Sequence, residues 1–564
     1  MLPEEYVDIL KRIYAADVAQ KTAMRINELV SSAQPRLQSD QHEMSAEDIV
    51  LITYGDTIGE QGARPLHALR DFYNQHLKGL VNSIHILPFH PYTSDDGFSV
   101  VDYYKIDPAL GEWSDIEKLG SDIRLMFDAV VNHVSKSSPW FKGFLAADES
   151  FANWFIEVDA DEDLSLVTRP RSTPVLSDFK GVDGKIHHIW TTFSEDQVDL
   201  NVENPNVLIA LLEVLLFYVS EGAKYIRLDA IAFLWKEIGT SCVNLPQTHD
   251  IVRVIRRAID DVNQATLIIT ETNVPHKENI AYLGNGHDQA HMVYNFALPP
   301  LVAYSLLTGS ANKLLHWAQN LKLPSDRTCF LNFTASHDGI GIRPVEHILN
   351  GSERDLLLDA AVEHGGFTSY GRNSDGTRSA YELNISFLDL LSSPEDTNEL
   401  RASRLLASQA ITLAMPGVPA IYIHSILGSR NDLEAVERTG QKRSINRSKL
   451  DLEILTRELA DKSSLRAMVF DQMAVFLRAR KNEPAFDPYG GFSFPVFNDH
   501  LFSVLRESEG RRILCLTNLS SGTVVFRPKF SASSAQDIIS GADITLNEIS
   551  VPSYGTLWLD LGSG

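Results

Sequence analysis

The run YIRLDA, residues 225–230, places an arginine and an aspartate two residues apart in an otherwise apolar segment. Alternate residues of a strand point to the same face, so Arg227 and Asp229 leave such a strand together. Charged side chains are seldom buried without a partner. The guanidinium of Arg227 would hold a buried Asp229 in its ionised form. We therefore interpret Asp229 as a candidate nucleophile.

Further acids and histidines end other apolar runs. Glu271 ends IITE, His337 and Asp338 end TASHD, and His133 ends VVNH. Each acid alone could cap a following helix, but together they predict one pocket. Two carboxyl groups can cleave a glycosidic bond with retention. One attacks the anomeric carbon, and the other protonates the leaving oxygen and later deprotonates the incoming group. A third carboxylate can stabilise the developing positive charge.

The elements that must position these side chains are eight apolar runs of strand-like length. Helical patterns such as NVLIALLEVLLFYVSEG lie between them. Eight strand–helix alternations predict an α/β fold, a (β/α)8 TIM barrel, in preference to an open doubly wound sheet. Strand ends face the active site in such barrels. The eight runs cover residues 49–55, 83–89, 123–133, 225–230, 266–272, 291–296, 330–338 and 417–423.

The remaining segments predict appendages of the barrel. Apolar residues spaced by three and four indicate helix near the start, and short period-two strands from about residue 490 indicate a terminal β-sandwich. Two connections are too long for ordinary loops and are therefore expected to be functional. The predicted division is a helical extension over 1–46, the barrel over 47–134 and 196–485 with an insertion at 339–400, an inserted B domain over 135–195, and a C-terminal β domain over 486–564.

Composition limits the classes of partner. The chain has 564 residues and a formal net charge of −24, which disfavours nucleic acid and anionic membranes as partners. Its three cysteines show no metal-ligand spacing, its first residues lack a secretory apolar region, and no apolar run approaches 18 residues. We expect a cytoplasmic protein, and the oligomeric state is left open, with a homo-oligomer as one outcome.

The motifs YIRLDA, IITE, ASHDGIG and VVNH resemble the four signature regions of the α-amylase superfamily, glycoside hydrolase family 13. The resemblance implies that Asp229 is the nucleophile, Glu271 the acid/base and Asp338 the transition-state stabiliser. It also implies a site for glucose. The matching residues are Asp95, His133, Arg227 and His337.

Other stretches are similar to the sucrose phosphorylase subfamily, which transfers glucose to phosphate. They include LITYGDTIG, FALPPL, ILGSRND and DDGF, in which Phe98 would face the oxocarbenium-like centre or simply pack in the core. TRPRS and GQKRSINRS would bring Arg171, Arg443 and, less strongly, Arg447 towards phosphate or the acceptor, because arginine binds oxyanions in a bidentate manner. Exposed basic turns are the alternative for these arginines.

Many α-amylases hold calcium near the asparagine of the NH pair, here Asn132. The sequence shows no acidic cage around this position, and the phosphorylase branch generally does without the ion. We expect no metal and no organic cofactor.

The acceptor side departs from the sucrose enzymes. The stretch YGRNSDGTRSAYELNIS introduces Asp375 and Arg378, and an anionic acceptor would account for an added arginine. The N-terminal extension, TRPR, ITETNVPHK and DGTRSAYE are similar to subfamily members that use D-glycerate, which implies a glucosyl-glycerate, inorganic phosphate and D-glycerate as small-molecule partners. The alternatives are sucrose, sucrose 6′-phosphate or glucosylglycerol phosphorolysis, α-glucoside hydrolysis or transglucosylation, and remotely a non-catalytic barrel. The acceptor-side candidates are Phe233, Asn273, Arg378, Tyr381 and Glu382.

Overall fold

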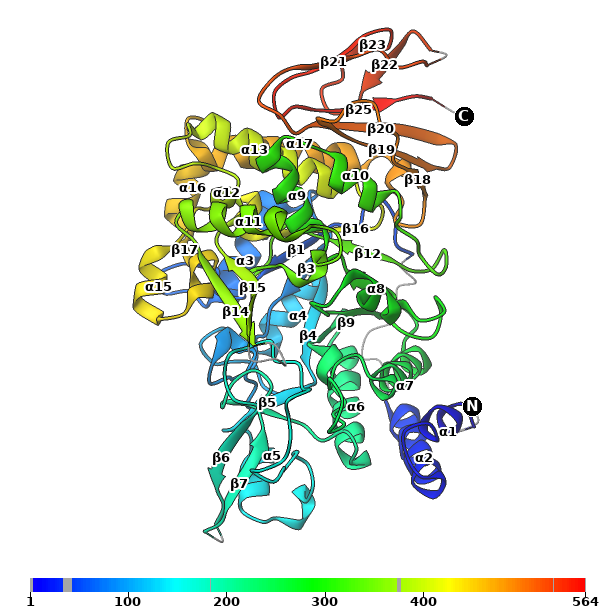
Figure 1. Ribbon diagram of the computed structural model, residues 1–564, viewed down its shortest axis with the longest axis vertical. Helices are drawn as coiled ribbons and strands as arrows, with labels where there is room; N and C mark the ends of the chain where they lie inside the picture. Colours follow the sequence, from blue (N-terminus) through cyan, green and yellow to red (C-terminus); the bar gives the residue numbers. More distant parts are fainter. Residues whose placement is uncertain (1–3, 34–42, 183, 373–376, 531, 563–564) are drawn as a thin grey trace.

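A closed barrel of eight parallel strands forms the centre of the protein (Figure 1). The computed structural model describes residues 4–33, 43–182, 184–372, 377–530 and 532–562. The eight apolar runs of the sequence are the eight barrel strands, which confirms the predicted fold class. In order around the barrel they are β1 (Val50–Thr53), β3 (Ser83–Ile86), β4 (Arg124–Val130), β9 (Ala223–Asp229), β10 (Leu267–Thr270), β11 (Met292–Tyr294), β12 (Cys329–Asn332) and β16 (Val418–Tyr422).

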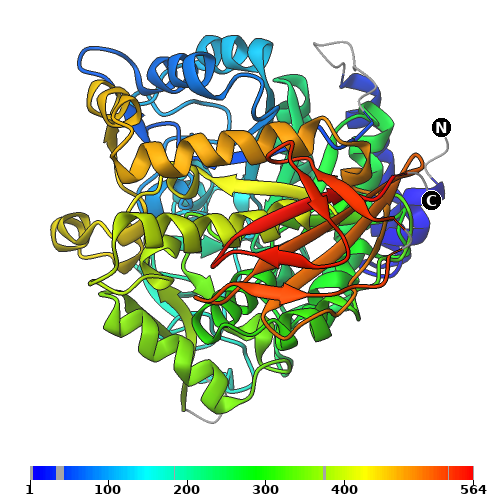
Figure 2. The same cartoon turned by 90° about the horizontal axis from the view of Figure 1, so that it is seen from above.

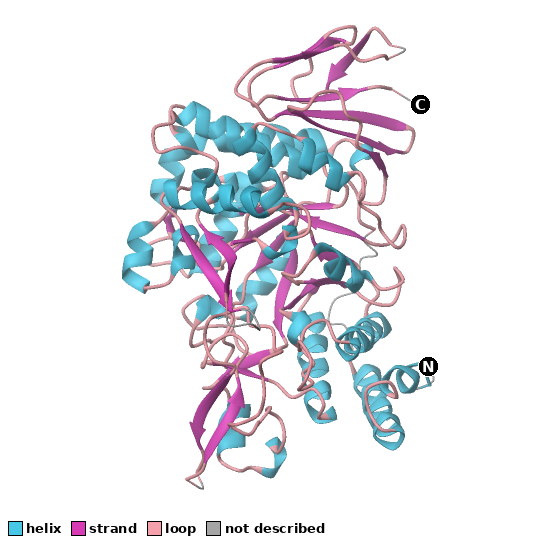
Figure 3. Cartoon of the chain, in the orientation of Figure 1, coloured by secondary structure: helices cyan, strands magenta, loops and turns pink. Residues whose placement is uncertain are grey.

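Helices surround this barrel, as the colouring by secondary structure shows (Figure 3). Several begin with proline in the first turn, where the missing N–H is not needed. The main ones are α3 (Pro65–Phe72), α4 (Trp113–Asp122), α6 (Pro205–Ser220), α7 (Pro246–Val262), α8 (His276–Ile280), α9 (Leu298–Thr308), α10 (Asn312–Ala318), α13 (Asn398–Ala414), α16 (Leu452–Ala460) and α17 (Leu465–Lys481).

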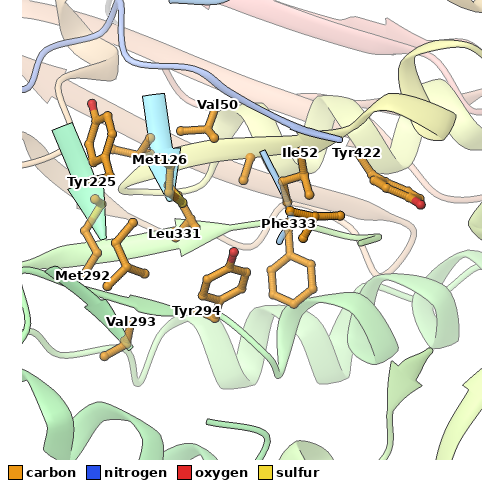
Figure 4. Packing of buried hydrophobic residues seen from close by; sticks show 14 of the residues in the cluster. Val50, Ile52, Met126, Tyr225, Met292, Val293, Tyr294, Leu331, Phe333 and Tyr422 are labelled. Carbon is orange, nitrogen blue, oxygen red and sulfur yellow. The ribbon is translucent and has the colours of Figure 1, made fainter. Parts of the chain in front are cut away.

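Apolar side chains pack within the barrel. Met126, Tyr225, Met292, Leu331 and Tyr422 come from five different strands and belong to one buried cluster (Figure 4). Bulky side chains fill the interior of barrels of this kind, so the barrel is a packed core and not a pore. The strand ends that carry the candidate site are therefore fixed by a close-packed interior.

Two insertions lie at the C-terminal ends of the strands. The first follows β4, and its strand β5 pairs antiparallel with β8. The second follows β12, and β13, β15 and β14 form a small antiparallel sheet. Of the two insertions, the first lies at the end of the molecule opposite the C-terminal sheets (Figure 1). Their elements are β5 (His133–Ser135), α5 (Pro139–Leu145), β6 (Leu176–Lys180), β7 (Ile186–Trp190), β8 (Gln197–Asp199), β13 (Ile340–Gly341), α11 (Gly351–Glu363), β14 (Phe367–Arg372) and β15 (Arg378–Asn384).

The C-terminal segment forms two antiparallel sheets, which lie across α13 and α17 (Figure 2). Arg480 of α17 is fully buried and donates to the carbonyl oxygens of Leu413 and Gly417, just before β16. Arg506 is also fully buried and donates to the carbonyl oxygen of Met415 at 2.9 Å. The strands are β18 (Gly491–Ser493), β19 (Leu501–Ser508), β20 (Arg511–Asn518), β21 (Val524–Phe526), β22 (Ser534–Asp537), β23 (Asp543–Thr545), β24 (Ile549–Val551) and β25 (Thr556–Asp560).

The predicted N-terminal helix consists of two helices, α1 (Glu4–Leu10) and α2 (Ala16–Ser32), which lie beside α6 and α7 (Figure 1). The Tyr6 hydroxyl donates to Asp261 of α7 at 2.8 Å, and the Tyr14 hydroxyl donates to the Val202 carbonyl oxygen at 2.6 Å. The extension is thus fixed to the outer wall of the barrel. None of the described helices combines the length and the apolar character needed to cross a bilayer.

Candidate active site

The three candidate catalytic carboxylates line one cavity of about 670 Å³, a volume that includes its open mouth. Asp229 is the last residue of β9, and Glu271 directly follows β10. Asp338 lies six residues beyond β12, because the pairing of β12 with β16 ends at Asn332. The sequence wrongly placed Asp338 at the end of a strand, and His133 likewise opens β5 instead of ending β4.

Arg227 is shared between two aspartates. Its Nη1 donates to Asp229 Oδ1 at 2.8 Å and also contacts Asp128 Oδ1 on β4. The other oxygen of Asp128 lies 2.6 Å from His85 Nε2. Burial lowers the pKa of His85, so its neutral ring donates to Asp128. The sequence offered Asp229 as the only partner of Arg227, whereas the guanidinium serves both carboxylates.

Burial is the largest influence on Asp229 and Glu271, and it raises the pKa of both carboxyl groups. Arg227 opposes this effect at both carboxyl groups but does not cancel it, so the pKa of Asp229 is raised and not lowered as its arginine neighbour suggested. The two acids line one cavity, and the charge of Glu271 raises the pKa of Asp229, so the two carboxyl groups titrate as a pair. Arg227 donates to Asp229 at 2.8 Å but lies 3.9 Å from Glu271. When the pair holds one proton, the negative charge is therefore favoured on Asp229 and the proton on Glu271.

The turn after β9 fixes the relative position of these two acids. Ala230 adopts a left-handed backbone conformation with φ of 48°. This conformation is strained for a residue with a side chain. It directs the Ala230 N–H to Glu271 Oε2 at 3.0 Å. The backbone next to the candidate nucleophile thus holds the candidate acid.

Two arginines and a histidine surround Asp338. Arg443 Nη1 lies 2.7 Å from Asp338 Oδ1, and Arg447 Nη2 lies 3.9 Å from the same oxygen. Burial alone would raise the pKa of Asp338, but Arg443, His337 and Arg447 hold it below its ordinary value. Asp338 is therefore an anion at neutral pH, suited to facing a developing positive charge.

Four of the predicted glucose-binding residues line the cavity, whereas Arg227 is not among the described residues that line it. Phe98 stacks on His337 with ring centroids 4.9 Å apart and an angle of 3° between the rings. The Arg227 guanidinium lies 5.7 Å from the Phe98 ring centroid. His133 Nε2 lies 2.9 Å from the Phe98 carbonyl oxygen. Asp95, Phe98, His133 and His337 all line the cavity that contains the three carboxylates.

Arg447 contacts the segments that carry two predicted glucose-binding residues, Asp95 and His337. Its Nη1 donates to Asp96 at 2.6 Å, and its Nε donates to the His337 carbonyl oxygen at 2.8 Å. The side chain is buried, and its guanidinium faces the Tyr54 ring. Arg447 thus supports the loops of Asp95 and His337.

The predicted acceptor-side residues divide into two groups. Arg171, Phe233, Asn273, Tyr381, Glu382 and Arg443 line the cavity with the carboxylates. Arg378 opens β15, is exposed, and is absent from the described residues that line this cavity. Asp375 lies outside the described residues. Burial raises the pKa of Tyr381 to about 12, so its phenol stays protonated and can donate a hydrogen bond.

The sequence analysis missed several residues that line the cavity. Gln197 Nε2 lies 3.3 Å from the Phe98 carbonyl oxygen and 3.2 Å from His133 Nε2. The Phe193 ring contacts the rings of His133 and Phe233. Both residues lie in the stretch WTTFSEDQVDLN, in which the sequence predicted no site residue. The complete set of missed lining residues is Phe193, Gln197, Ala230, Ala232, Thr272, Phe296 and Gly339.

The Asn132 region, where the resemblance to α-amylases raised the question of calcium, contains a buried lysine. Lys236 is buried, and its Nζ lies 2.7 Å from Asn132 Oδ1 and 2.6 Å from Asp199 Oδ2. Asp199 also accepts from the Thr192 hydroxyl at 2.6 Å. The oxygen atoms that would bind a cation thus already bind an ammonium group, so these residues do not fit calcium. Among the described residues, no group of three or more acids, histidines or cysteines is arranged to hold a metal.

Comparisons with known proteins agree with this architecture. The family model described as alpha amylase, catalytic domain, matches residues 74–338. Glucosylglycerate phosphorylase from Escherichia coli (strain K12) is 42% identical over 560 residues, covering 99% of this chain and 100% of that protein. The enzyme of the same name from Allomeiothermus silvanus is 48% identical over 446 residues, covering 79% and 80%. The crystal structure of sucrose 6F-phosphate phosphorylase from Thermoanaerobacter thermosaccharolyticum superposes with a TM-score of 0.76 at 24% identity, covering 91% of this chain and 100% of that one.

The barrel and the matched catalytic domain define an enzyme of the α-amylase type. The high identity over nearly the whole chain narrows this class. The chain belongs to the glucosylglycerate phosphorylase family, whose more distant relatives include sucrose and glucosylglycerol phosphorylases.

Proposed function

We propose that the protein is a retaining phosphorylase that converts 2-O-α-D-glucosyl-D-glycerate and inorganic phosphate into α-D-glucose 1-phosphate and D-glycerate. The observation that carries the proposal is a single cavity in which three carboxylates lie beside Arg171 and Arg443. Such a cavity offers acids for bond cleavage together with cations for an anionic acceptor. The family relationship supports the same reaction. The buried, unpaired cysteines fit the reducing cytoplasm as the compartment.

The first half-reaction forms a glucosyl-enzyme. The Asp229 carboxylate attacks C1 of the glucosyl group, and the C1–O bond to glycerate breaks. Glu271 gives its proton to the departing oxygen, which is why a raised pKa suits this side chain. Asp338 stabilises the positive charge that develops on the ring, since Arg443, His337 and Arg447 keep it ionised. The intermediate is a β-linked ester of Asp229.

The second half-reaction transfers glucose to phosphate. A phosphate oxygen attacks C1 on the side that glycerate left, and the ester bond to Asp229 breaks. Glu271 accepts a proton if the entering phosphate carries one on that oxygen. Two inversions give net retention. Arg171 provides the guanidinium that faces the acceptor anion, because it lines both the catalytic cavity and the wider cavity at its mouth.

The same anion-binding geometry would serve both half-reactions. The D-glycerate carboxylate and inorganic phosphate are both oxyanions that an arginine can bind through two N–H groups. A neutral acceptor such as glycerol would leave Arg171 with only the 3.5 Å contact to Glu382 and would add no second anionic partner. The site therefore favours charged acceptors over glycerol and over water.

The test measures phosphate release from α-D-glucose 1-phosphate with D-glycerate, glycerol, fructose, fructose 6-phosphate or no acceptor. Strong release with D-glycerate alone supports the proposal. A preference for another acceptor would leave the carboxylate mechanism in place and refute the acceptor assignment. Equal release without acceptor would refute the phosphorylase assignment, because water would then compete freely for the glucosyl-enzyme.

A further inference from the structure

Four side chains of alternating charge connect the glucose site to the mouth of the cavity. Asp338 is followed by Arg443, whose Nη1 lies 2.7 Å from Asp338 Oδ1. Arg443 Nε and Nη2 donate to the two oxygens of Glu382 at 3.0 and 2.8 Å. Arg171 Nη1 lies 3.5 Å from Glu382 Oε1. We call Asp338, Arg443, Glu382 and Arg171 the charge row.

Glu382 is the buried centre of the charge row. Its side chain is 2% exposed. Burial would raise its pKa, but Arg443 and Arg171 hold the pKa below its ordinary value, so Glu382 is charged. Its strand β15 pairs with β13, which begins two residues after Asp338, and Gly341 lies opposite Glu382 in this pairing. The backbone therefore fixes Glu382 close to the loop of Asp338.

The contacts along the charge row are unequal. Arg443 is bound on both sides, because all three nitrogens of its guanidinium contact Asp338 or Glu382. Arg171 makes the longest contact of the row, at 3.5 Å, and its side chain is 25% exposed. Arg171 is therefore the member that an anion from solvent reaches with the least loss of existing contacts.

We propose that Glu382 is a positioning residue. It couples anion binding at Arg171 to the strength with which Arg443 binds Asp338 in the glucose site. This inference rests on the proposed function and names how the acceptor site and the glucose site act together. An anion that binds Arg171 takes that guanidinium away from Glu382. Glu382 then interacts with Arg443 alone and holds it more strongly. Arg443 in turn binds Asp338 less strongly.

The consequence is reciprocal stabilisation of the two ligands. When Arg443 binds Asp338 less strongly, the Asp338 carboxylate accepts stronger hydrogen bonds from sugar hydroxyls. It also stabilises positive charge at C1 more strongly. Charged contacts in a buried site of low dielectric respond strongly to such rearrangement. Linkage requires that glucose strengthens anion binding by the same factor. The arrangement thus favours glucosyl transfer when an anionic acceptor is present.

The experiment measures D-glucose binding to the full-length protein by calorimetry, with and without saturating inorganic phosphate, at matched ionic strength. We expect phosphate to lower the Kd of glucose by about fivefold or more, the lower end of usual coupling factors. In Glu382→Gln the factor should fall towards one, because the amide keeps the shape of the side chain but not its charge. D-glycerate in place of phosphate should behave in the same way.

The control is Glu363→Gln, which removes the same charge from an exposed residue at the end of α11 and should keep the wild-type factor. A wild-type factor of one, a weakening of glucose binding by phosphate, or full coupling in Glu382→Gln would each overturn the proposal. If Glu382→Gln does not fold, the wild-type factor still decides. No turnover is measured, so failure here is distinct from failure of the phosphorolysis assay.

Discussion

Replacement of Lys236 by methionine tests the buried cation that occupies the Asn132 region. Lys236 Nζ lies 2.6 Å from Asp199 Oδ2, and the side chains of both residues are almost fully buried. Methionine keeps much of the length of lysine and removes its charge. Asp199 would keep its hydrogen bonds from Thr192 and Asn132 but would lose its positive partner.

Breaking a buried ion pair by removing one partner costs about 3–5 kcal/mol, because an uncompensated charge stays in the interior. An unfolding entropy of about 2.1 cal/mol/K per residue gives about 1.2 kcal/mol/K for a cooperative unit of 564 residues. The expected loss in Tm is therefore about 2.5–4 °C. Removing both charges, in Lys236→Met with Asp199→Asn, should recover most of this loss.

Differential scanning calorimetry and urea unfolding of the two single variants and the double variant measure these effects. Lys136→Met is the matched control, because Lys136 pairs with exposed Glu195 at 2.7 Å. Such a surface pair contributes about 0–1 kcal/mol. The reasoning fails if Lys236→Met unfolds like the control, or if the losses of the single variants simply add in the double variant.

Three further predictions concern the reaction. Glu271→Gln should lower kcat by about 10²–10⁴-fold with the glycerate glucoside. With α-glucosyl fluoride the loss should be far smaller, because the fluoride leaving group needs no proton. Equal losses with the two substrates would contradict the role of Glu271 as the acid. Because burial raises the pKa of Glu271, the pH profile of kcat/KM should have its basic limb above the pH range in which an ordinary glutamate titrates. Activity should fall as the pH rises through this limb, because Glu271 then loses the proton that it donates. A basic limb that persists in Glu271→Gln would refute the assignment. Arg171→Ala should raise KM for phosphate and D-glycerate in steady-state assays far more than Lys136→Ala does. Lys136 is the comparison because its ammonium group is already paired with Glu195. Similar increases in KM for the two variants would show that Arg171 is not part of the anion site.

The sequence predicted the parts of the molecule that depend on short-range pattern. Strand length and apolar character located all eight barrel strands, because a strand buried on both sides has a continuous apolar run. The position of Asp229 followed from the two-residue period of a strand. The roles assigned to the site residues and the division into domains stay predictions.

Contacts between distant segments could not be predicted in this way. Arg227 is shared with Asp128, which lies 99 residues earlier, and Glu382 binds Arg443, which lies 61 residues later. The ammonium of Lys236 reaches Asn132 across 104 residues. The pKa of Asp229 depends on burial, which a neighbouring arginine in the sequence does not reveal. Each of these features is set by tertiary packing alone.

The buried guanidinium groups of Arg480 and Arg506 bear on how the chain can be divided. They donate to main-chain carbonyl oxygens just before β16, and Arg506 belongs to the C-terminal sheets. A barrel cut free of those sheets would lose the donor to Met415 and expose the apolar surface beneath them. Unpaired carbonyl groups and bare apolar surface both favour aggregation. Exchange of C-terminal modules between related enzymes should therefore succeed only when the incoming module brings an arginine to this position.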